Sequence, residues 1–146
     1  MTHKELVEKA RFWLLSAKGC NPVFTEKGSA HSNERPDAIG WSGQESIIVE
    51  CKTTETDLRA DAKKTFRPNS HTGMGNLRYY LFPDDLWETI KNKSDINFFG
   101  FGIVCIDLNG FAYQVRLKHS AKFICNERAE IYYLRNRILE VQKYGR

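Results

Sequence analysis

The chain has 146 residues, of which 41% are hydrophobic and 27% charged, a composition that fits one globular domain over residues 1–146 with a sizeable core. Its 22 basic and 18 acidic residues give a net charge of +4, which permits a polyanionic partner but differs from a basic nucleic-acid-binding tail. Charges interrupt every apolar run near the N-terminus and no stretch is long enough to span a bilayer, so we expect no signal peptide, no membrane partner and a cytoplasmic protein.

A helix is predicted at the start of the chain. Thr2 and Glu5 have the spacing of a capping box, and apolar side chains recur at helical spacing until Gly19 ends the run. These side chains are Leu6, Ala10, Trp13, Leu14 and Ala17. We then expect a short strand from Val23 to Glu26 and a polar loop from Gly28 to Asn33.

Two apolar strands follow, joined by a tight hairpin at residues 42–44. The first strand carries Asp37 and the second carries Glu50 and Lys52. Because side chains alternate between the two faces of a strand, each of these charged residues continues a row of apolar side chains on one face. For a connection of two to four residues, Asp37 lies opposite or next to Glu50. Like charges that face one another destabilise a sheet, so the pair requires a compensating cation, either Lys52 or a metal.

A polar second helix is predicted directly after the second strand, ending near Lys64. Asp57, Asp61 and Lys64 share one face, as a solvated charge ladder or as part of a site for metal, water or phosphate. The loop from Thr65 to Leu77 is rich in turn formers and has cations at both ends, so we expect it to face a substrate. The cations predicted to contact nucleic acid are Lys63, Lys64, Arg67 and Arg78.

One more strand and a short helix are predicted after this loop. Residues 78–82 form the strand, in which Tyr79 and Tyr80 are expected to be core residues rather than platforms for stacked bases. Pro83 ends the strand and an aspartate caps the helix. The apolar side chains of that helix are Leu86, Trp87 and Ile90.

A second hairpin and a terminal helix complete the predicted fold. The apolar run over 98–108 and a strand over 111–117 are joined by Asn109-Gly110, a strong turn signal. The side chains of Phe111, Tyr113, Val115 and Leu117 are expected to turn inward. The helix is expected from Glu127, on the spacing of Ile131, Leu134, Ile138 and Val141.

The cysteines and histidines give no sign of a structural metal site. No C-x-x-C pair and no H-x-x-x-H spacing occurs. We therefore expect reduced thiols that pack as small hydrophobic side chains. The cysteines are Cys20, Cys51, Cys105 and Cys125.

In this part of the chain an aspartate follows a proline, and about a dozen residues later Glu-x-Lys ends an apolar strand that precedes a polar helix. This order resembles the active-site pattern of the PD-(D/E)XK nuclease superfamily. The matching residues are Pro36, Asp37, Glu50, Cys51 and Lys52. The surrounding stretch, with RPDAIGW before the motif, looks like the small stand-alone members found in bacteria and phages. This resemblance implies a restriction-endonuclease-like fold with an α-β-β-β-α-β core. The elements predicted above agree with that order, in an α/β fold with a mixed central sheet to which the C-terminal hairpin and helix are added.

The same resemblance implies a divalent-metal-dependent nuclease that hydrolyses phosphodiester bonds, with DNA as the substrate that the family favours. Asp37, Glu50 and Lys52 would be the catalytic residues. Asp37, Glu50 and the backbone carbonyl of Cys51 would bind Mg²⁺, for which Mn²⁺ would substitute. Lys52 would hold or deprotonate the attacking water, or neutralise charge on the phosphate. The first helix of the family sometimes lends an acid, but we assign its glutamates here to capping and solvated roles.

Two other functions are compatible with the sequence. One is a catalytically silent nucleic-acid-binding module of the same fold, which would be expected to have lost at least one of Asp37, Glu50 and Lys52. The other is a phage-encoded interaction protein that acts on a host factor and exposes a large apolar patch. With one domain we expect little base specificity, unless a homo-oligomer or another partner supplies it.

Overall fold

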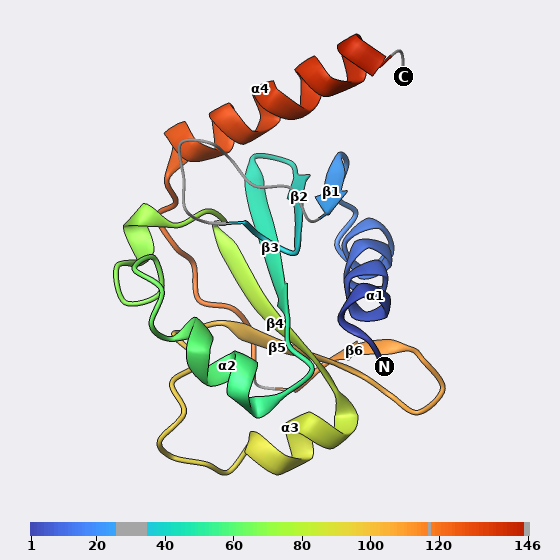
Figure 1. Ribbon diagram of the computed structural model, residues 1–146, viewed down its shortest axis with the longest axis vertical. Coiled ribbons are helices and arrows are strands. Elements are labelled where there is room, and N and C mark those ends of the chain that lie inside the picture. The colour runs from blue at the N-terminus through green and yellow to red at the C-terminus, as the bar shows by residue number, and fades with distance from the viewer. Residues whose placement is uncertain (26–34, 117, 145–146) are drawn as a thin grey trace.

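The computed structural model describes residues 1–25, 35–116 and 118–144, in which a six-stranded mixed sheet has helices on both faces (Figure 1). The strands are β1 (Val23–Thr25), β2 (Ala38–Ser42), β3 (Glu45–Cys51), β4 (Leu77–Pro83), β5 (Gly102–Ile106) and β6 (Ala112–Gln114). The helices are α1 (His3–Ser16), α2 (Glu55–Asp61), α3 (Asp84–Ile90) and α4 (Glu127–Tyr144), with a 3-10 turn η1 (Ser70–Thr72). The predicted loop over 28–33, the strand end at Glu26 and Leu117 lie outside the described residues.

The strands follow chain order across the sheet. β3, β4 and β5 pair in parallel, whereas the β1–β2, β2–β3 and β5–β6 pairs are antiparallel. The predicted α/β class, mixed sheet and order of elements from α1 to β4 are therefore confirmed. Within the described part of the chain, no helix combines the length and the apolar character needed to cross a membrane.

α1 covers one face of the sheet (Figure 1). It begins at the predicted cap: the Glu5 N–H donates to the Thr2 hydroxyl at 3.1 Å, and that hydroxyl donates to the Glu5 carboxylate at 3.2 Å. The β3 side chains on this face are Ile47, Val49 and Cys51, as the period of two predicts. The buried side chains of the helix are Leu6, Val7, Ala10, Trp13 and Leu14.

α2 and α3 cover the opposite face of the sheet. Thr54 caps α2 as predicted, since its hydroxyl accepts the Asp57 N–H at 3.2 Å, but the helix ends at Asp61 and does not continue to Lys64. The buried cluster on this face joins Leu58 of α2, Leu86, Trp87 and Ile90 of α3, and Tyr80, Phe82 and Ile103 of the strands. The buried positions of Tyr79 and Tyr80 confirm that both are core residues.

The tight hairpin predicted between β2 and β3 is confirmed. Its connection consists of residues 43–44, the first of which is a glycine with φ of +60°. The last pair of this ladder is Ala38 with Val49. The ladder ends one residue before Asp37 and Glu50, and the Asp37 carboxylate accepts the N–H of Cys51, the residue after Glu50, so Asp37 lies beside the end of β3.

The second hairpin differs from its prediction. The Gly110 N–H donates to the Asp107 carbonyl at 2.9 Å, and Gly110 has φ of +85°, so the connection is longer than a two-residue turn. The longer connection changes which side chains of the following strand face the core. Phe111 and Tyr113 were expected to turn inward, but they are 71% and 42% exposed.

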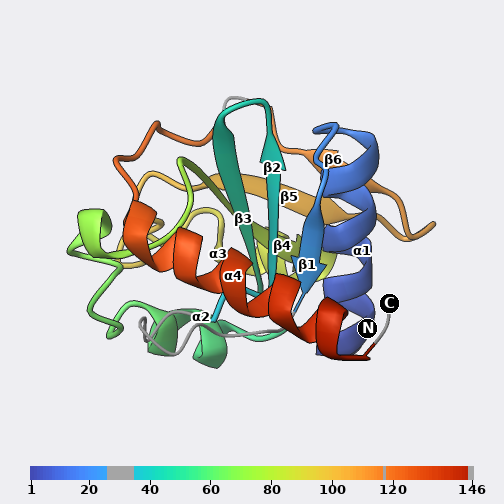
Figure 2. The same ribbon diagram turned by 90° about the horizontal axis from the view of Figure 1, so that it is seen from above.

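α4 begins at Glu127 as predicted and lies across β1 to β3 (Figure 2). The side that it buries is not the predicted one. The Glu130 carboxylate accepts the Ser46 hydroxyl at 2.8 Å and the Gly75 N–H at 2.7 Å, so this polar contact orients the helix. Ala129 and Tyr133 are buried beside it. The predicted apolar side chains that remain exposed are Ile131, Ile138 and Val141.

The cysteines are free thiols, as expected. Cys20, Cys51 and Cys105 are buried in the two clusters that cover the sheet. Burial raises the pKa of Cys20 to about 11 and that of Cys105 to about 12, which keeps both thiols protonated.

Candidate functional site

The ionisable side chains predicted for the site lie together. Asp37, Glu50, Cys51 and Lys52 line one cavity of about 300 Å³ at the carboxyl end of β3. The cavity exists there because the hairpin register brings the start of β2 beside the end of β3. Its other described lining residues are His3, Arg35, Asp57, Ala60, Asp61 and Lys64.

Asp37 is fixed by the backbone of β3. Its Oδ2 accepts the Cys51 N–H at 2.8 Å, and its side chain is 16% exposed. Its Oδ1 lies 3.2 Å from Nε2 of His3, the first residue of α1. Sequence reasoning missed His3, because a lone histidine at the start of a helix carries no signal that it will reach a distant strand.

Arg67 accompanies Glu50. Its Nη2 lies 3.3 Å from Glu50 Oε1, and both side chains are buried. The sequence indicated Lys52 or a metal as the compensating cation, and the structure provides a buried arginine from the segment after α2. Arg67 was expected to contact nucleic acid, and this prediction is wrong, because only 2% of the residue is exposed.

Asp61 lies at the centre of a buried polar cluster. Arg67 Nε donates to its Oδ2 at 2.5 Å, and the Tyr80 hydroxyl donates to the same oxygen at 2.6 Å. On its other oxygen, the ammonium groups of Lys52 and Lys64 lie at 3.4 and 3.1 Å. The Asp61 side chain is fully buried, which excludes the solvated charge ladder as its role.

The charges around Asp61 determine its protonation. Burial by itself would raise the pKa of Asp61, but Arg67, by charge and hydrogen bonding, and the charge of Lys52 hold that pKa well below its usual range. Burial and the neighbouring Asp61 raise the pKa of Tyr80, so its hydroxyl remains a donor. Asp61 is therefore an anion at neutral pH, and it holds the Lys52 ammonium at the cavity.

The predicted nucleic-acid-binding cations divide into two groups. Lys63 and Lys64 are exposed after α2, and Lys64 lines the cavity. Arg78 is fully buried, and its guanidinium donates to the backbone carbonyls of Gly75 and Ser70, each at 2.8 Å. The expected contact of Arg78 with nucleic acid is thus wrong, because this arginine holds together the loop that precedes β4.

The donor atoms at the cavity suit a hard divalent cation. Asp37 and Glu50 offer carboxylate oxygens, and Cys51 offers a backbone carbonyl while its thiol packs against α1. Each carboxylate oxygen has two lone pairs, so a contact with a hydrogen-bond donor does not exclude a cation. Among the described residues, no group of three or more His, Cys, Asp or Glu side chains is arranged to hold a metal ion. A bound Mg²⁺ would therefore depend on these two carboxylates together with backbone and water oxygens.

Comparison with known proteins gives a likeness of fold. No family model matches the sequence, and no curated protein matches it. Among solved structures, the SPO1766 protein of unknown function from Silicibacter pomeroyi is similar, with a TM-score of 0.65 and 15% identity. The match covers 98% of this chain and 92% of that chain. At this identity the likeness shows a shared fold alone.

Proposed function

We propose that this chain is a divalent-metal-dependent nuclease that hydrolyses phosphodiester bonds of DNA. The observation that carries the proposal is the grouping of Asp37, Glu50 and Lys52 around one cavity. The PD-(D/E)XK pattern of these residues supports it, as does the α-β-β-β-α-β order from α1 to β4. On the same grounds we propose that the fold has a restriction-endonuclease-like core.

The carboxylates of Asp37 and Glu50 explain the need for a metal ion. Two neighbouring carboxylates repel one another and repel phosphate, so they favour a cation between them and the substrate. When bound, Mg²⁺ or Mn²⁺ would supply charge that acidifies water and neutralises the phosphate. Asp37, Glu50 and the Cys51 carbonyl would hold the ion at the cavity.

Lys52 is the residue that we assign to the attacking water or to the charge that builds up on the phosphate. Its side chain is only 11% exposed, and its ammonium lies 3.4 Å from Asp61 Oδ1. Because Arg67 and Tyr80 fix the Asp61 carboxylate, Lys52 Nζ would be held in place before the substrate arrives. Lys64 approaches the same carboxylate from the exposed side and would meet the phosphate backbone.

A catalytically silent nucleic-acid-binding module of the same fold is the second candidate. The contact between Glu50 and Arg67 favours it, since a buried guanidinium compensates this carboxylate without a metal ion. In such a module the Asp61 cluster would have a purely structural role, and Lys63 and Lys64 would supply the contacts with phosphate.

Metal-dependent nicking distinguishes the two candidates. Supercoiled plasmid, linear duplex and single strands would be incubated with the purified protein in Mg²⁺, Mn²⁺ or EDTA, and binding would be measured in Ca²⁺ and in EDTA. The nuclease is expected to cut with Mg²⁺ or Mn²⁺, to be inactive in EDTA, and to bind DNA more tightly in Ca²⁺ than in EDTA. Equal binding in Ca²⁺ and EDTA, with no cleavage under any condition, would instead identify the silent module.

A further inference from the structure

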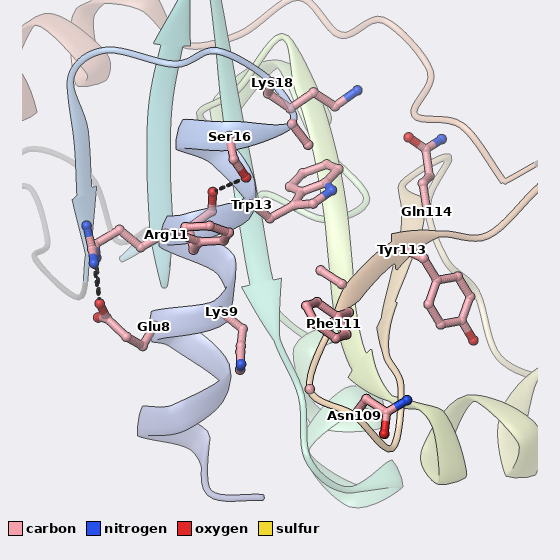
Figure 3. A pocket seen from close by; sticks show the side chains of 14 residues that line it. Glu8, Lys9, Arg11, Trp13, Ser16, Lys18, Asn109, Phe111, Tyr113 and Gln114 are labelled. Carbon is pink, nitrogen blue, oxygen red and sulfur yellow. Dashed lines mark hydrogen bonds and ion pairs between the residues drawn. The ribbon is translucent and has the colours of Figure 1, made fainter.

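A second cavity, of about 860 Å³, lies between α1 and the β5–β6 hairpin (Figure 3). None of its described lining residues also lines the candidate catalytic cavity. We call it the aromatic groove, because the rings of Phe12 and Phe111 line it and are 65% and 71% exposed. Single exposed apolar side chains are ordinary, but exposed rings gathered around one cavity indicate a binding surface.

The rings come from both walls of the aromatic groove. α1 supplies Phe12 and Trp13, and the hairpin supplies Phe111. In Figure 3, Trp13 and Phe111 lie in the space between the helix and the hairpin. The hairpin wall is anchored, since the Tyr113 hydroxyl donates to the Asp84 carboxylate at the start of α3. A groove with fixed walls loses little conformational entropy when it binds a ligand.

Cations accompany these rings. Among the described lining residues, Lys9, Arg11 and Lys18 are opposed by one carboxylate, that of Glu8, which pairs with Arg11. Lys9 and Lys18 thus leave the groove with an excess of positive charge. The Lys18 ammonium lies 5.3 Å from the ring centroid of Trp13, which places a cation directly beside the aromatic wall.

We propose that the aromatic groove binds an unpaired segment of a nucleic-acid strand. Bases stack on Phe12 and Phe111, and phosphates meet Lys9 and Lys18. Rings beside cations are the combination that single-strand-binding surfaces use, because any base can stack on a ring while the cations follow the backbone. An apolar partner would bury the two lysines without opposite charges, and a duplex keeps its base faces stacked inside the helix.

The aromatic groove extends the proposed function to a second surface that requires neither metal nor Lys52. Binding there is therefore measured in EDTA, as the fluorescence anisotropy of a labelled unpaired oligonucleotide of about twelve nucleotides. Absence of metal-dependent cleavage would contradict the proposed nuclease activity, whereas absence of binding in EDTA would contradict the proposed role of the groove, so the two failures can be told apart.

Removing the two most exposed rings tests the stacking contacts. The double variant Phe12→Ala with Phe111→Ala is expected to bind the oligonucleotide at least about 10-fold more weakly. Both side chains are largely exposed, so the fold should persist, which thermal unfolding would verify. Lys9→Gln with Lys18→Gln is expected to flatten the salt dependence of binding, by about 0.7 in logarithmic slope for each lost phosphate contact.

Leu108→Ala is the matched control. Leu108 is a fully exposed apolar side chain of the same hairpin that does not line the aromatic groove, so this variant should bind as the wild type does. The proposal is overturned if the double ring variant binds as tightly as the wild type, or if Leu108→Ala weakens binding equally. It is also overturned if a duplex of the same sequence, or a free mononucleotide, binds as tightly as the unpaired strand.

Discussion

Arg67 and Asp61 form a fully buried ion pair beside the candidate catalytic cavity, with Arg67 Nε 2.5 Å from Asp61 Oδ2. Burying two charges costs several kcal/mol of solvation free energy, which good geometry and further hydrogen bonds must offset. Here the Tyr80 hydroxyl and the Lys52 ammonium provide those additional contacts. The pair thereby joins the segment after α2 to the central strand β4 and to Lys52.

Breaking this pair should destabilise the fold strongly. Asp61→Asn removes the carboxylate that lies closer to the buried guanidinium of Arg67 and leaves Glu50 as its remaining anion, and we expect the free energy of unfolding to fall by about 3–5 kcal/mol. Urea unfolding followed by circular dichroism would measure the change. Asp57→Asn is the matched control, since this exposed aspartate of the same helix should alter stability by less than about 1 kcal/mol. A loss for Asp61→Asn no larger than that of the control would contradict the structural role of the pair.

The depressed pKa of Asp61 predicts sensitivity to acid. Its pKa is lower in the folded than in the unfolded state, so the unfolded chain takes up the proton first as the pH falls. The contribution of Asp61 to stability is therefore complete above about pH 5 and decreases as the pH falls toward its folded-state pKa. Unfolding free energies measured between neutral pH and about pH 3 should fall less steeply for Asp61→Asn than for the wild type. Equal slopes would argue against this linkage.

Asp37→Asn and Glu50→Gln should each abolish metal-dependent cleavage while the fold remains intact. Both changes keep the shape of the side chain and remove the charge that a divalent ion requires. Asp37→Asn should also leave thermal stability equal or higher, because it relieves the repulsion between two neighbouring carboxylates. Glu45→Gln, an exposed change at the other end of β3, should cleave normally. Normal turnover by either folded site variant would remove the metal site from the proposal.

Lys52→Ala should lower turnover by at least about 100-fold and barely change DNA affinity. Lys52 is one positive charge among 22, so its loss removes little of the overall attraction for phosphate. Single-turnover cleavage and binding in Ca²⁺ would measure the two effects separately. Lys91→Ala, an exposed lysine directly after α3, is the control for loss of one positive charge. Turnover that falls only in proportion to affinity would show that Lys52 does not act in the chemical step.

Lys63 and Lys64 should determine the salt dependence of DNA binding. Changing both to Ala should weaken binding to all sequences similarly and reduce the logarithmic salt slope by roughly one unit for each lost phosphate contact. Because Arg78 is buried, Arg78→Met should instead reduce thermal stability and leave that slope unchanged. Titrations at several salt concentrations would test both statements, and an unchanged slope in the lysine variant would place both lysines away from the bound DNA.

The hairpin of β2 and β3 could be predicted because its signals are local. A two-residue connection fixes the register, and the period of two then determines which face each side chain occupies. The position of Asp37 beside the end of β3 could therefore be predicted from the sequence. The capping signals at Thr2 and Thr54 were equally local, and both located the start of a helix correctly.

The cluster around Asp61 could not be predicted in this way. An arginine in a polar, turn-rich segment gives the same sequence signal whether the chain folds it inward or leaves it in water. Arg67 and Arg78 were both assigned to the surface, and both are buried by contacts with residues on other segments. The spacing of Ile131 and Ile138 predicted a helix correctly, but the Glu130 contacts decide which side of that helix is buried.

Two charged residues near Glu50 lie at different separations from it along the chain. Asp37, which lines the same cavity, belongs to the same hairpin, whose strands are joined by two residues. Arg67, whose guanidinium contacts Glu50, follows α2 and precedes β4. Hairpins close within about 1–10 μs, whereas pairings across long loops form more slowly. We therefore expect the two carboxylates to meet early in folding and to repel one another until Arg67 arrives, so the candidate site is completed only when the parallel half of the sheet has formed.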